Sequence, residues 1–402
     1  MKEERERKLA IFNFEIMSKS KKYIVFGSPY VGREEIAEMA KTLKSGWLGT
    51  GPKVAKFEEL ISRYTGAKFG LALNSCTAGL HLSLLVAGIG QGDEVITTPL
   101  TFCATVNAIV HSGARPVFAD VDKETMNIDA DQIEKAITKR TRAIIPVHLA
   151  GRPCEMDKIL KIAKKHKLIV IEDAAQALGS EYKGRKIGSF GDLTCFSFYV
   201  TKNIITGEGG MVTTNNKIFA DKIKIYALHG MSKDAWKRYS DDGYKHYEVI
   251  YPGFKYNMTD MQASLGLHQM RRIAEFDKAR QKIWDFYNAG FEDLPVTLPA
   301  PLTENIHHNK HLYTLLIDKK RSGLSRDDFM QKLHQRGIGT GVHFIPVHLH
   351  KYYRERFDYK IGDFPNAEYI GLRTVSLPLS AKLTESEVKK IVETVRKILL
   401  KK

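Results

Sequence analysis

The sequence predicts an α/β protein: a large domain with a mostly parallel sheet flanked by helices, then a smaller C-terminal α+β domain. From Phe69 onward apolar runs alternate with helix-like segments, and runs such as "AIIPVHL" and "LIVIED" are continuously apolar, as strands buried on both faces are. Near Asp293 the proline-rich "LPVTLPAPLTEN" indicates a boundary. We therefore expect an N-terminal arm over residues 1–25, a large domain over 26–290 and a small domain over 291–402.

Two helices are expected ahead of the sheet, in "REEIAEMAKTL" and "VAKFEELISRY". Their apolar residues recur at helical spacing: Ile36, Ala40 and Leu43 in the first, and Val54, Phe57, Ile61 and Tyr64 in the second. The intervening "SGWLGTGP" is rich in glycine and ends in proline, which predicts a loop.

The large domain then alternates strands and helices. The expected strands are "FGLALN", "EVITTP", "RPVFADV", "AIIPVHL", "LIVIED", "CFSFYV" and "GGMVTTN". The expected helices between them are "TAGLHLSLLVAG", "FCATVNAIVHSG", "DADQIEKAI" and "EMDKILKIAKKHK", the third opening with aspartates suited to a helix N-cap. One long helix should cover "MTDMQASLGLHQMRRIAEFDKARQKIWDFY", and "HLYTLLID", "SRDDFMQKLHQRG" and "SEVKKIVETVRKIL" should form the small domain.

Composition narrows the function. The net charge of +16 favours anionic partners, but the basic residues are spread along the chain without interleaved aromatics, so we expect no nucleic-acid partner. The four cysteines include no CxxC pair, which favours a reducing compartment and gives no support for a metal site. No apolar stretch approaches the roughly 20 residues of a membrane span. We therefore expect a cytoplasmic protein without a membrane partner.

Polar residues follow the expected strands where, in open α/β sheets, ligands bind. Each has an ordinary structural explanation. Asp173 would cap a helix in "AAQALG", Ser75 and Thr77 would start another, and the glycines of "TGEGG" would form a plain turn. Phe102 would belong to the core, and Lys202 would be a surface cation.

Taken together, the same residues fit pyridoxal phosphate. An amine is needed for its aldehyde, a carboxylate for its pyridine nitrogen, and an aromatic neighbour for its ring. Hydroxyls and backbone amides at a helix start suit its phosphate. The candidates are Lys202 for the aldehyde, Asp173 for the nitrogen, Phe102 for the ring, Ser75, Cys76, Thr77 and Ser197 for the phosphate, and Gln176 for the phenolic oxygen.

The segment "EDAAQALGSEYKGRKIGSFGDLTCFSFYVTKNIITGEGGMVTT" closely resembles the DegT-type sugar-nucleotide aminotransferases. The resemblance runs from "GREEI" to the C-terminus and implies fold type I, pyridoxal phosphate, and the roles just given for Lys202, Asp173, Gln176, Phe102, Thr77 and Ser197. At position 76 the family often has Gly or Ala, so only the Cys76 backbone is assigned to the phosphate. Asn257, in "KYNMTD", would reach the phosphate of the second subunit of a homodimer with shared active sites.

The resemblance also implies the reaction. L-Glutamate would donate the amino group and leave as 2-oxoglutarate, and a nucleotide-linked keto sugar would accept it. The tail "GIGTGVHFIPVHLHKYYRERF" is most similar to the UDP-4-keto-pentose enzymes of lipid A modification. Residues that match family positions near the sugar-nucleotide pocket are Trp47, Thr50, His229 and His343, although His343 has an equally good explanation as a structural histidine between domains.

Two other functions stay open. In the first alternative, the chain is a non-transaminating relative, either a sugar dehydratase or a regulator. Dehydratases of the family lack the lysine that this chain keeps. A nicotinamide dehydrogenase would need a glycine loop between a strand and a helix. The one candidate, "GIGQGD", follows a helix and precedes a strand, so we reject it.

Overall fold

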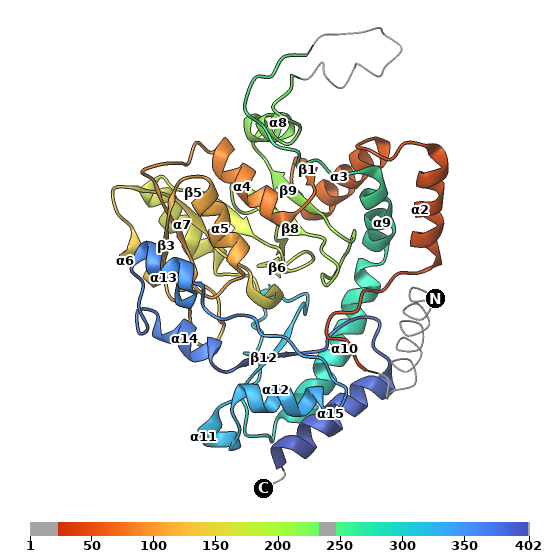
Figure 1. Ribbon diagram of the computed structural model, residues 1–402, viewed down its shortest axis with the longest axis vertical. Coiled ribbons are helices and arrows are strands. Elements are labelled where there is room, and N and C mark those ends of the chain that lie inside the picture. The colour runs from red at the N-terminus through yellow and green to blue at the C-terminus, as the bar shows by residue number, and fades with distance from the viewer. Residues whose placement is uncertain (1–22, 233–246, 401–402) are drawn as a thin grey trace, which may run out of the picture.

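The computed structural model describes residues 23–232 and 247–400, and a seven-stranded sheet forms its centre (Figure 1). Its strands are β1 (Phe69–Leu73), β2 (Glu94–Thr97), β3 (Arg115–Phe118), β4 (Thr141–Ile145), β5 (Ile169–Asp173), β8 (Leu193–Ser197) and β9 (Gly210–Thr214). The order across the sheet is β1-β9-β8-β5-β4-β2-β3. Neighbours from β3 to β8 pair in parallel, whereas β9 is antiparallel to both β8 and β1. The predicted mostly parallel sheet is confirmed.

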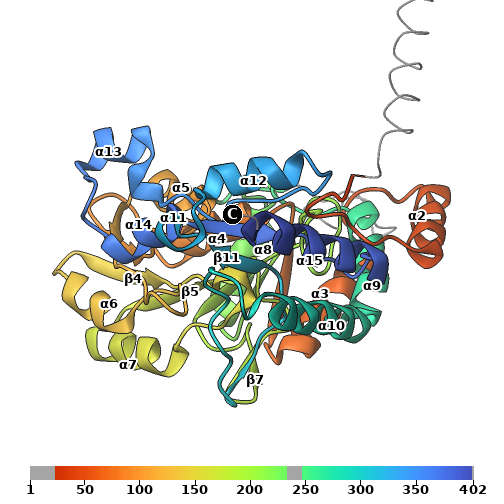
Figure 2. The ribbon, with the colours of Figure 1, turned by 90° about the horizontal axis from the view of Figure 1, so that it is seen from below.

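Helices cover both faces of this sheet. They are α3 (Pro52–Thr65), α4 (Cys76–Val86), α5 (Cys103–His111), α6 (Ala130–Ala136), α7 (Met156–His166) and α8 (Lys217–Tyr226). Figure 2 shows α4 and α5 on one side of β4 and β5, and α6 and α7 on the other. The expected helices are confirmed, including the N-cap of α6, where the Asp129 side chain accepts a hydrogen bond from the Asp131 amide.

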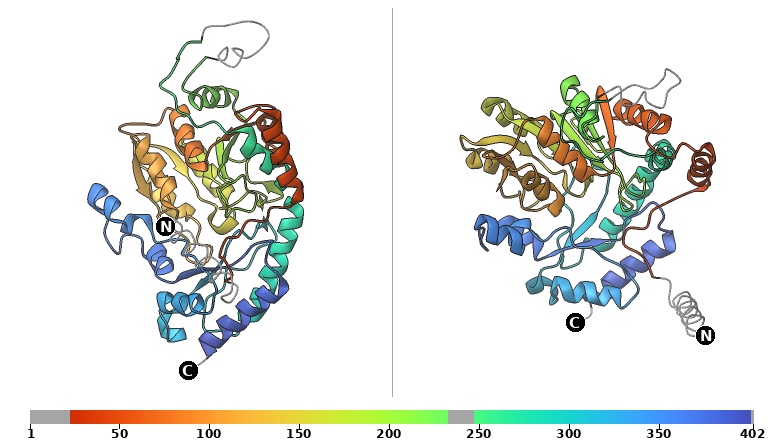
Figure 3. Two further views of the ribbon diagram at one scale, coloured as in Figure 1. Left: turned by 45° about the vertical axis from the view of Figure 1, so that its right-hand side comes forward. Right: turned by 45° about the horizontal axis from the view of Figure 1, so that its top comes forward.

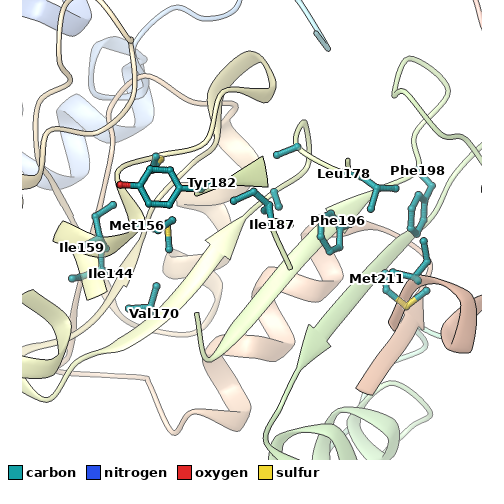
Figure 4. Close-up of a cluster of buried hydrophobic side chains, with 14 of the residues drawn as sticks. Ile144, Met156, Ile159, Val170, Leu178, Tyr182, Ile187, Phe196, Phe198 and Met211 are labelled. Carbon is teal, nitrogen blue, oxygen red and sulfur yellow. The ribbon is translucent and has the colours of Figure 1, made fainter. Parts of the chain in front are cut away.

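Strand side chains alternate between two hydrophobic cores, one on each face. Ile144, Val170 and Phe196 point into the core drawn in Figure 4. The residues that follow Ile144 and Val170, Ile145 and Ile171, point into the opposite core. Because successive side chains on a strand face opposite ways, a strand buried on both faces needs an unbroken apolar run. This is the physical basis of the continuous runs in the sequence.

Helix α2 (Arg33–Ser45) turns its apolar face outward. The predicted helix is present, but Ile36 and Leu43 are 62% and 52% exposed, and the buried residues are Glu35 and Thr42. Glu35 accepts a hydrogen bond from the Gln269 amide at 2.9 Å, so α2 attaches to the molecule through polar groups. In the right-hand view of Figure 3, α2 lies at the edge of the molecule.

The single long helix predicted after Asn257 is wrong. Two helices occupy the region, α9 (Asp260–Arg271) and α10 (Ile273–Phe291), and Arg272 between them leaves the helical conformation (φ −101°, ψ 5°). The Arg272 guanidinium binds Glu275 at 2.9 Å and lies 4.3 Å from the centre of the Tyr30 ring. No Gly or Pro marks the break, so the hydrophobic period alone does not reveal it.

The C-terminal part builds a third hydrophobic core. The elements of this part are β11 (Tyr313–Leu316), β12 (Thr374–Leu377), α11 (Lys319–Ser322), α12 (Arg326–His334), α13 (Lys351–Phe357), α14 (Pro365–Gly371), α15 (Glu385–Leu400) and the short η3 (Val347–Leu349). The short η1 (Leu149–Gly151) lies between β4 and α7. Tyr287 and Phe291 of α10 join this core, and so does Ile24. The left-hand view of Figure 3 shows α10 and α15 running side by side.

The predicted division into three parts stays a prediction. Helix α10 runs through the boundary at residue 290, and residues 1–22 of the predicted arm lie outside the described residues. A three-stranded sheet of β6 (Glu181–Tyr182), β7 (Arg185–Lys186) and β10 (Ile306–His307) joins the two regions of the sequence. Within residues 23–232 and 247–400, no helix is both long and apolar enough to cross a bilayer.

The core should be most sensitive where α3 meets α9. The Phe57 ring is fully buried, lies 5.0 Å from the Phe198 ring, and leaves no room for a side chain at Gly266. Phe57→Ala should cost about 3–5 kcal/mol of stability, because such a cavity does not close fully. Ile218→Ala removes a side chain that is 65% exposed and should cost less than about 0.5 kcal/mol. Urea unfolding midpoints measure both, and equal shifts would contradict the expectation.

Candidate active site

A cavity of about 450 Å³ lies at the edge of the sheet where the parallel strands end. Its walls come from the starts of α4 and α5, the turns after β5 and β8, and the C-terminal part of the chain. The predicted site residues that line it are Lys202, Asp173, Gln176, Phe102, Cys76, Thr77, Ser197 and His343. Trp47, Thr50, His229 and Asn257 do not line it.

Lys202 lies in the turn that follows β8. Its backbone amide donates to the Tyr199 carbonyl at 2.9 Å, which closes the turn and presents the side chain to the cavity. Burial lowers the pKa of the Lys202 amine, because a charged ammonium loses hydration there. A larger fraction of the amine is therefore unprotonated and nucleophilic near neutral pH.

Asp173 ends β5 and faces the same cavity. Its Oδ2 accepts a hydrogen bond from the Thr105 hydroxyl at 2.7 Å, and its Oδ1 accepts one from the Ala175 amide at 3.1 Å. Residues 174–180 form turns, so the interpretation of Asp173 as the cap of a helix in "AAQALG" is wrong. Sequence reasoning missed Thr105, although its place one helical turn after Phe102 was a usable signal.

Buried polar groups that the sequence analysis also missed hold the backbone at Asp173 in place. The His148 backbone amide donates to the Asp173 carbonyl, and His148 Nε2 lies 3.0 Å from Glu172 Oε2. The Cys154 amide donates to His148 Nδ1, so the ring proton sits on Nε2 and points at Glu172. These bonds fix the end of β5 and with it the direction of Asp173.

The start of α4 forms a seat for an anion. Ser75 is the N-cap, and its hydroxyl accepts from the Ala78 amide at 3.1 Å. The amides of Cys76 and Thr77 belong to the first turn, where an α-helix has no internal acceptors for them. The Cys76 thiol points to the Cys195 carbonyl in the core, so only its backbone faces the seat.

The glycines of "GEGG" are more than a turn. A Cβ on Gly210 would lie 2.3 Å from the Ser75 carbonyl carbon and 2.5 Å from the Cys76 nitrogen. Gly210 pairs with Ser197 in the register of β8 and β9, so the missing side chain lets Ser197 come close to the helix start. The interpretation as an ordinary turn therefore misses a close approach that only glycine permits.

Phe102 and Gln176 complete the walls. Phe102 is 59% exposed rather than part of the core, and its ring lies 6.0 Å from that of Phe344. The side-chain oxygen of Gln176, Oε1, accepts a hydrogen bond from the Ala150 backbone amide at 2.6 Å. The side-chain NH₂ group of Gln176 is therefore the donor available to a ligand.

These residues fit pyridoxal phosphate. The cavity places an amine, a carboxylate, an aromatic ring and an amide donor around a helix N-terminus. Lys202 would hold the aldehyde, Asp173 the pyridine nitrogen, and the start of α4 with Ser197 the phosphate.

Two histidines from the C-terminal part also face the cavity. His343 Nδ1 lies 2.8 Å from the Ser376 hydroxyl, and burial, aided by the nearby charge of Lys202, lowers its pKa to about 4. His311, which sequence reasoning missed, has a pKa well below its ordinary value, chiefly because it is buried and also because of Lys202. Both rings are therefore neutral at pH 7.

Three of the predicted residues form a separate cluster. The Asn257 amide donates to the Thr50 hydroxyl at 2.7 Å, and the Trp47 indole donates to the Thr50 carbonyl at 3.0 Å. Asn257 Oδ1 is buried and has no hydrogen-bond partner among the described residues. His229 lies elsewhere, in a turn where its amide donates to the Phe254 carbonyl.

Comparison with known proteins agrees with this chemistry. Residues 29–396 match the sequence profile of the DegT/DnrJ/EryC1/StrS aminotransferase family. The spore coat polysaccharide biosynthesis protein SpsC of Bacillus subtilis is 49% identical over 385 residues, 96% of this chain and 99% of that protein. The uncharacterized protein MJ1066 of Methanocaldococcus jannaschii is 57% identical over 371 residues, 92% of this chain and 96% of that protein.

Solved structures show the same fold. The putative sugar aminotransferase Spr1654 of Streptococcus pneumoniae in its PMP form superposes with a TM-score of 0.88 at 36% identity, covering 94% of this chain and 99% of that one. PseC of Helicobacter pylori, an aminotransferase involved in the biosynthesis of pseudoaminic acid, gives a TM-score of 0.87 at 32% identity, covering 94% and 100%.

The close approach at Gly210 gives a direct test of the anion seat. Gly210→Ala should push the end of β9 away from Ser75 and weaken binding of pyridoxal phosphate by about 5- to 150-fold, since overpacking of this kind costs about 1–3 kcal/mol. Gly90→Ala, whose added methyl would meet only the Ser112 carbonyl at 3.4 Å, is the control. Equilibrium titration of the cofactor-free protein measures both, and unchanged affinity in Gly210→Ala would contradict the seat.

Proposed function

The chain belongs to the DegT/DnrJ/EryC1/StrS aminotransferase family and is a pyridoxal-phosphate-dependent sugar aminotransferase, and we propose that it moves the amino group of L-glutamate onto a nucleotide-linked keto sugar. The observation that carries the proposal is that Lys202 and Asp173 line one cavity at the N-terminus of α4. The lysine favours an aminotransferase over the dehydratases of the family, which lack it.

The residues divide the work. When bound, pyridoxal phosphate supplies an aldehyde that carries the amino group and a ring that withdraws electrons. Asp173 keeps the ring nitrogen protonated through an ion pair, and Phe102 and Gln176 orient the ring. As general base and acid, the Lys202 amine would take the proton from the glutamate α-carbon in the first half-reaction and deliver one to the sugar carbon in the second. Glutamate leaves as 2-oxoglutarate.

The acceptor is proposed to be a UDP-4-keto sugar. The resemblance of the C-terminal segment to the UDP-4-keto-pentose enzymes supports this, and the net charge of +16 suits a diphosphate. His343 and Phe344 line the cavity from the C-terminal part, which supports a role for them in contacting the sugar. All four cysteines are free thiols, which suits the cytoplasm, where nucleotide sugars would be met.

We also propose a homodimer with shared active sites. Trp47, Thr50 and Asn257 cluster outside the cavity, and the buried Asn257 Oδ1 lacks a partner in the described part of the chain. The cluster adjoins α2, whose exposed Ile36 and Leu43 form an apolar face that a second copy would cover. On this proposal the Asn257 group completes the neighbour's cavity.

The acceptor is tested by two half-reactions. Protein loaded with cofactor, treated with glutamate and then freed of it, should recover its starting absorption spectrum when a UDP-4-keto sugar is added. Recovery with a free keto hexose should be far slower, because the nucleotide contributes binding energy that the free sugar lacks. Equal rates would contradict a nucleotide-sugar acceptor.

The assignment of Lys202 as the lysine that binds the cofactor is tested separately. Borohydride treatment followed by peptide mapping should find the cofactor on Lys202, and label on another lysine would overturn the assignment. Lys202→Ala should still bind cofactor but lose turnover by several orders of magnitude, because nucleophile and proton carrier are removed together.

The shared site is tested by mixing two defective variants. Asn257→Asp places a carboxylate near a phosphate, where like charges repel, and should weaken cofactor binding and activity. Lys202→Ala is inactive by itself. If Asn257 acts on the neighbouring subunit, a mixed dimer holds one site with both defects and one with neither, so activity returns after subunit exchange. A mixture that stays as inactive as its parents, with exchange verified by mass spectrometry, would show that Asn257 serves its own chain.

A further inference from the structure

A short buried segment, residues 308–311, runs between the two chain segments that carry Lys202 and Asp173. Asn309 lies at its centre and is only 3% exposed. Its side-chain NH₂ group donates to the backbone carbonyls of Gln176 and Leu178, both at 2.9 Å. Asn309 therefore holds the turn that follows Asp173 by its backbone.

The same residue also holds the turn that carries Lys202. Asn203 directly follows Lys202, and its side-chain NH₂ group donates to the Asn309 backbone carbonyl at 2.8 Å. Asn203 Oδ1 lies 2.9 Å from His311 Nδ1, and the His311 amide donates to Asn309 Oδ1 at 3.2 Å. Asn309 and His311, which are buried, and Asn203, which is partly buried, thus form one hydrogen-bonded network that reaches both turns.

The network also fixes the state of His311. Because the Asn203 NH₂ group is directed at the Asn309 carbonyl, its oxygen faces His311, and His311 Nδ1 must be the donor. The neutral ring therefore carries its proton on Nδ1 and leaves Nε2 as an acceptor toward the cavity that it lines. A second cation beside Lys202 is avoided in this arrangement.

We propose that Asn309, acting with Asn203, is a positioning residue that sets the Lys202 amine at the distance from Asp173 that the cofactor requires. The inference rests on the proposed function for the identity of the ligand, but the geometry belongs to the chain alone. Asn309 does not line the cavity; it acts by tying the turn at Gln176 and Leu178 to the turn at Asn203.

The chain contains a matched control. Asn127 is also buried, at 5% exposure, and its NH₂ group donates to the Arg152 and Pro153 carbonyls at 2.9 and 3.0 Å. Its Oδ1 accepts from the Leu149 amide at 3.0 Å. Asn127→Ala and Asn309→Ala therefore remove the same three kinds of side-chain hydrogen bond, and Asn127 holds no segment that carries Lys202.

The first measurement uses the full chain without cofactor. The rate at which acetic anhydride modifies Lys202, followed by peptide mass spectrometry across pH, reports the pKa of the amine. In the wild-type protein the midpoint should lie below the ordinary lysine value, since burial lowers this pKa. Asn309→Ala and Asn203→Ala should raise the midpoint toward that value, because a loosened turn admits water. Asn127→Ala should leave it unchanged.

The second measurement is cofactor affinity. Asn309→Ala should weaken binding of pyridoxal phosphate by about tenfold or more, and Asn127→Ala by less than about threefold, at similar losses in melting temperature. Equal effects of the two variants on the Lys202 midpoint and on affinity would show that Asn309 is merely structural. If Asn309→Ala does not fold, Asn203→Ala, which breaks the link on the lysine side only, decides the question. Failure to find cofactor on wild-type Lys202 would instead refute the proposed function and leave the pH measurement valid.

Discussion

The parallel sheet is the constraint on which the rest of the molecule depends. Strands β5 and β8 run side by side in the same direction, so Asp173 at the end of one and the Lys202 turn after the other emerge at one edge. Strand β9 returns antiparallel, and Gly210 lets it approach the N-terminus of α4. An amine, a carboxylate and an anion seat from three separate parts of the sequence therefore meet at this edge.

Bringing an amine into a poorly hydrated cavity requires control of every charge around it. His311 and His343 face Lys202, and burial lowers the pKa of both well below neutrality, so neither adds a cation. Behind them the Arg280 guanidinium is buried, and it donates to the backbone carbonyls of Lys310, His311 and Leu379. Carbonyl dipoles, together with the nearby Asp277 carboxylate, stabilise that charge. Asp173 and Glu208 are the carboxylates that line the cavity with Lys202.

Much of this organisation was predictable because it depends on local patterns. The continuous apolar runs give the buried strands, and the residues just beyond them, Asp173 and Lys202 above all, give the centre of the site. The break at Arg272 was not predictable, since no Gly or Pro marks it and one of the rings that Arg272 contacts, Tyr30, is far away in sequence. The roles of His311 and Asn309 were not predicted for the same reason. Nothing in a loop sequence indicates which distant turn its side chains will contact. The outward face of α2 shows that helical periodicity locates an apolar face but not the surface that it meets.

The placement of the polar groups in α2 and around Asn257 follows one physical rule. Helix α2 exposes Ile36 and Leu43 and buries Glu35, so it contacts the rest of the chain through hydrogen bonds instead of apolar side chains. This arrangement gains little stability in an isolated chain. The Asn257 Oδ1, which is buried and has no hydrogen-bond partner among residues 23–232 and 247–400, is also unfavourable, because a buried acceptor without a donor has lost its hydration. Both costs disappear if a second copy covers the face and a ligand or water reaches the amide. Within the described residues, these two unfavourable features lie close together in the chain's contacts, because Trp47 and Thr50, which contact Asn257 or its partner, directly follow α2.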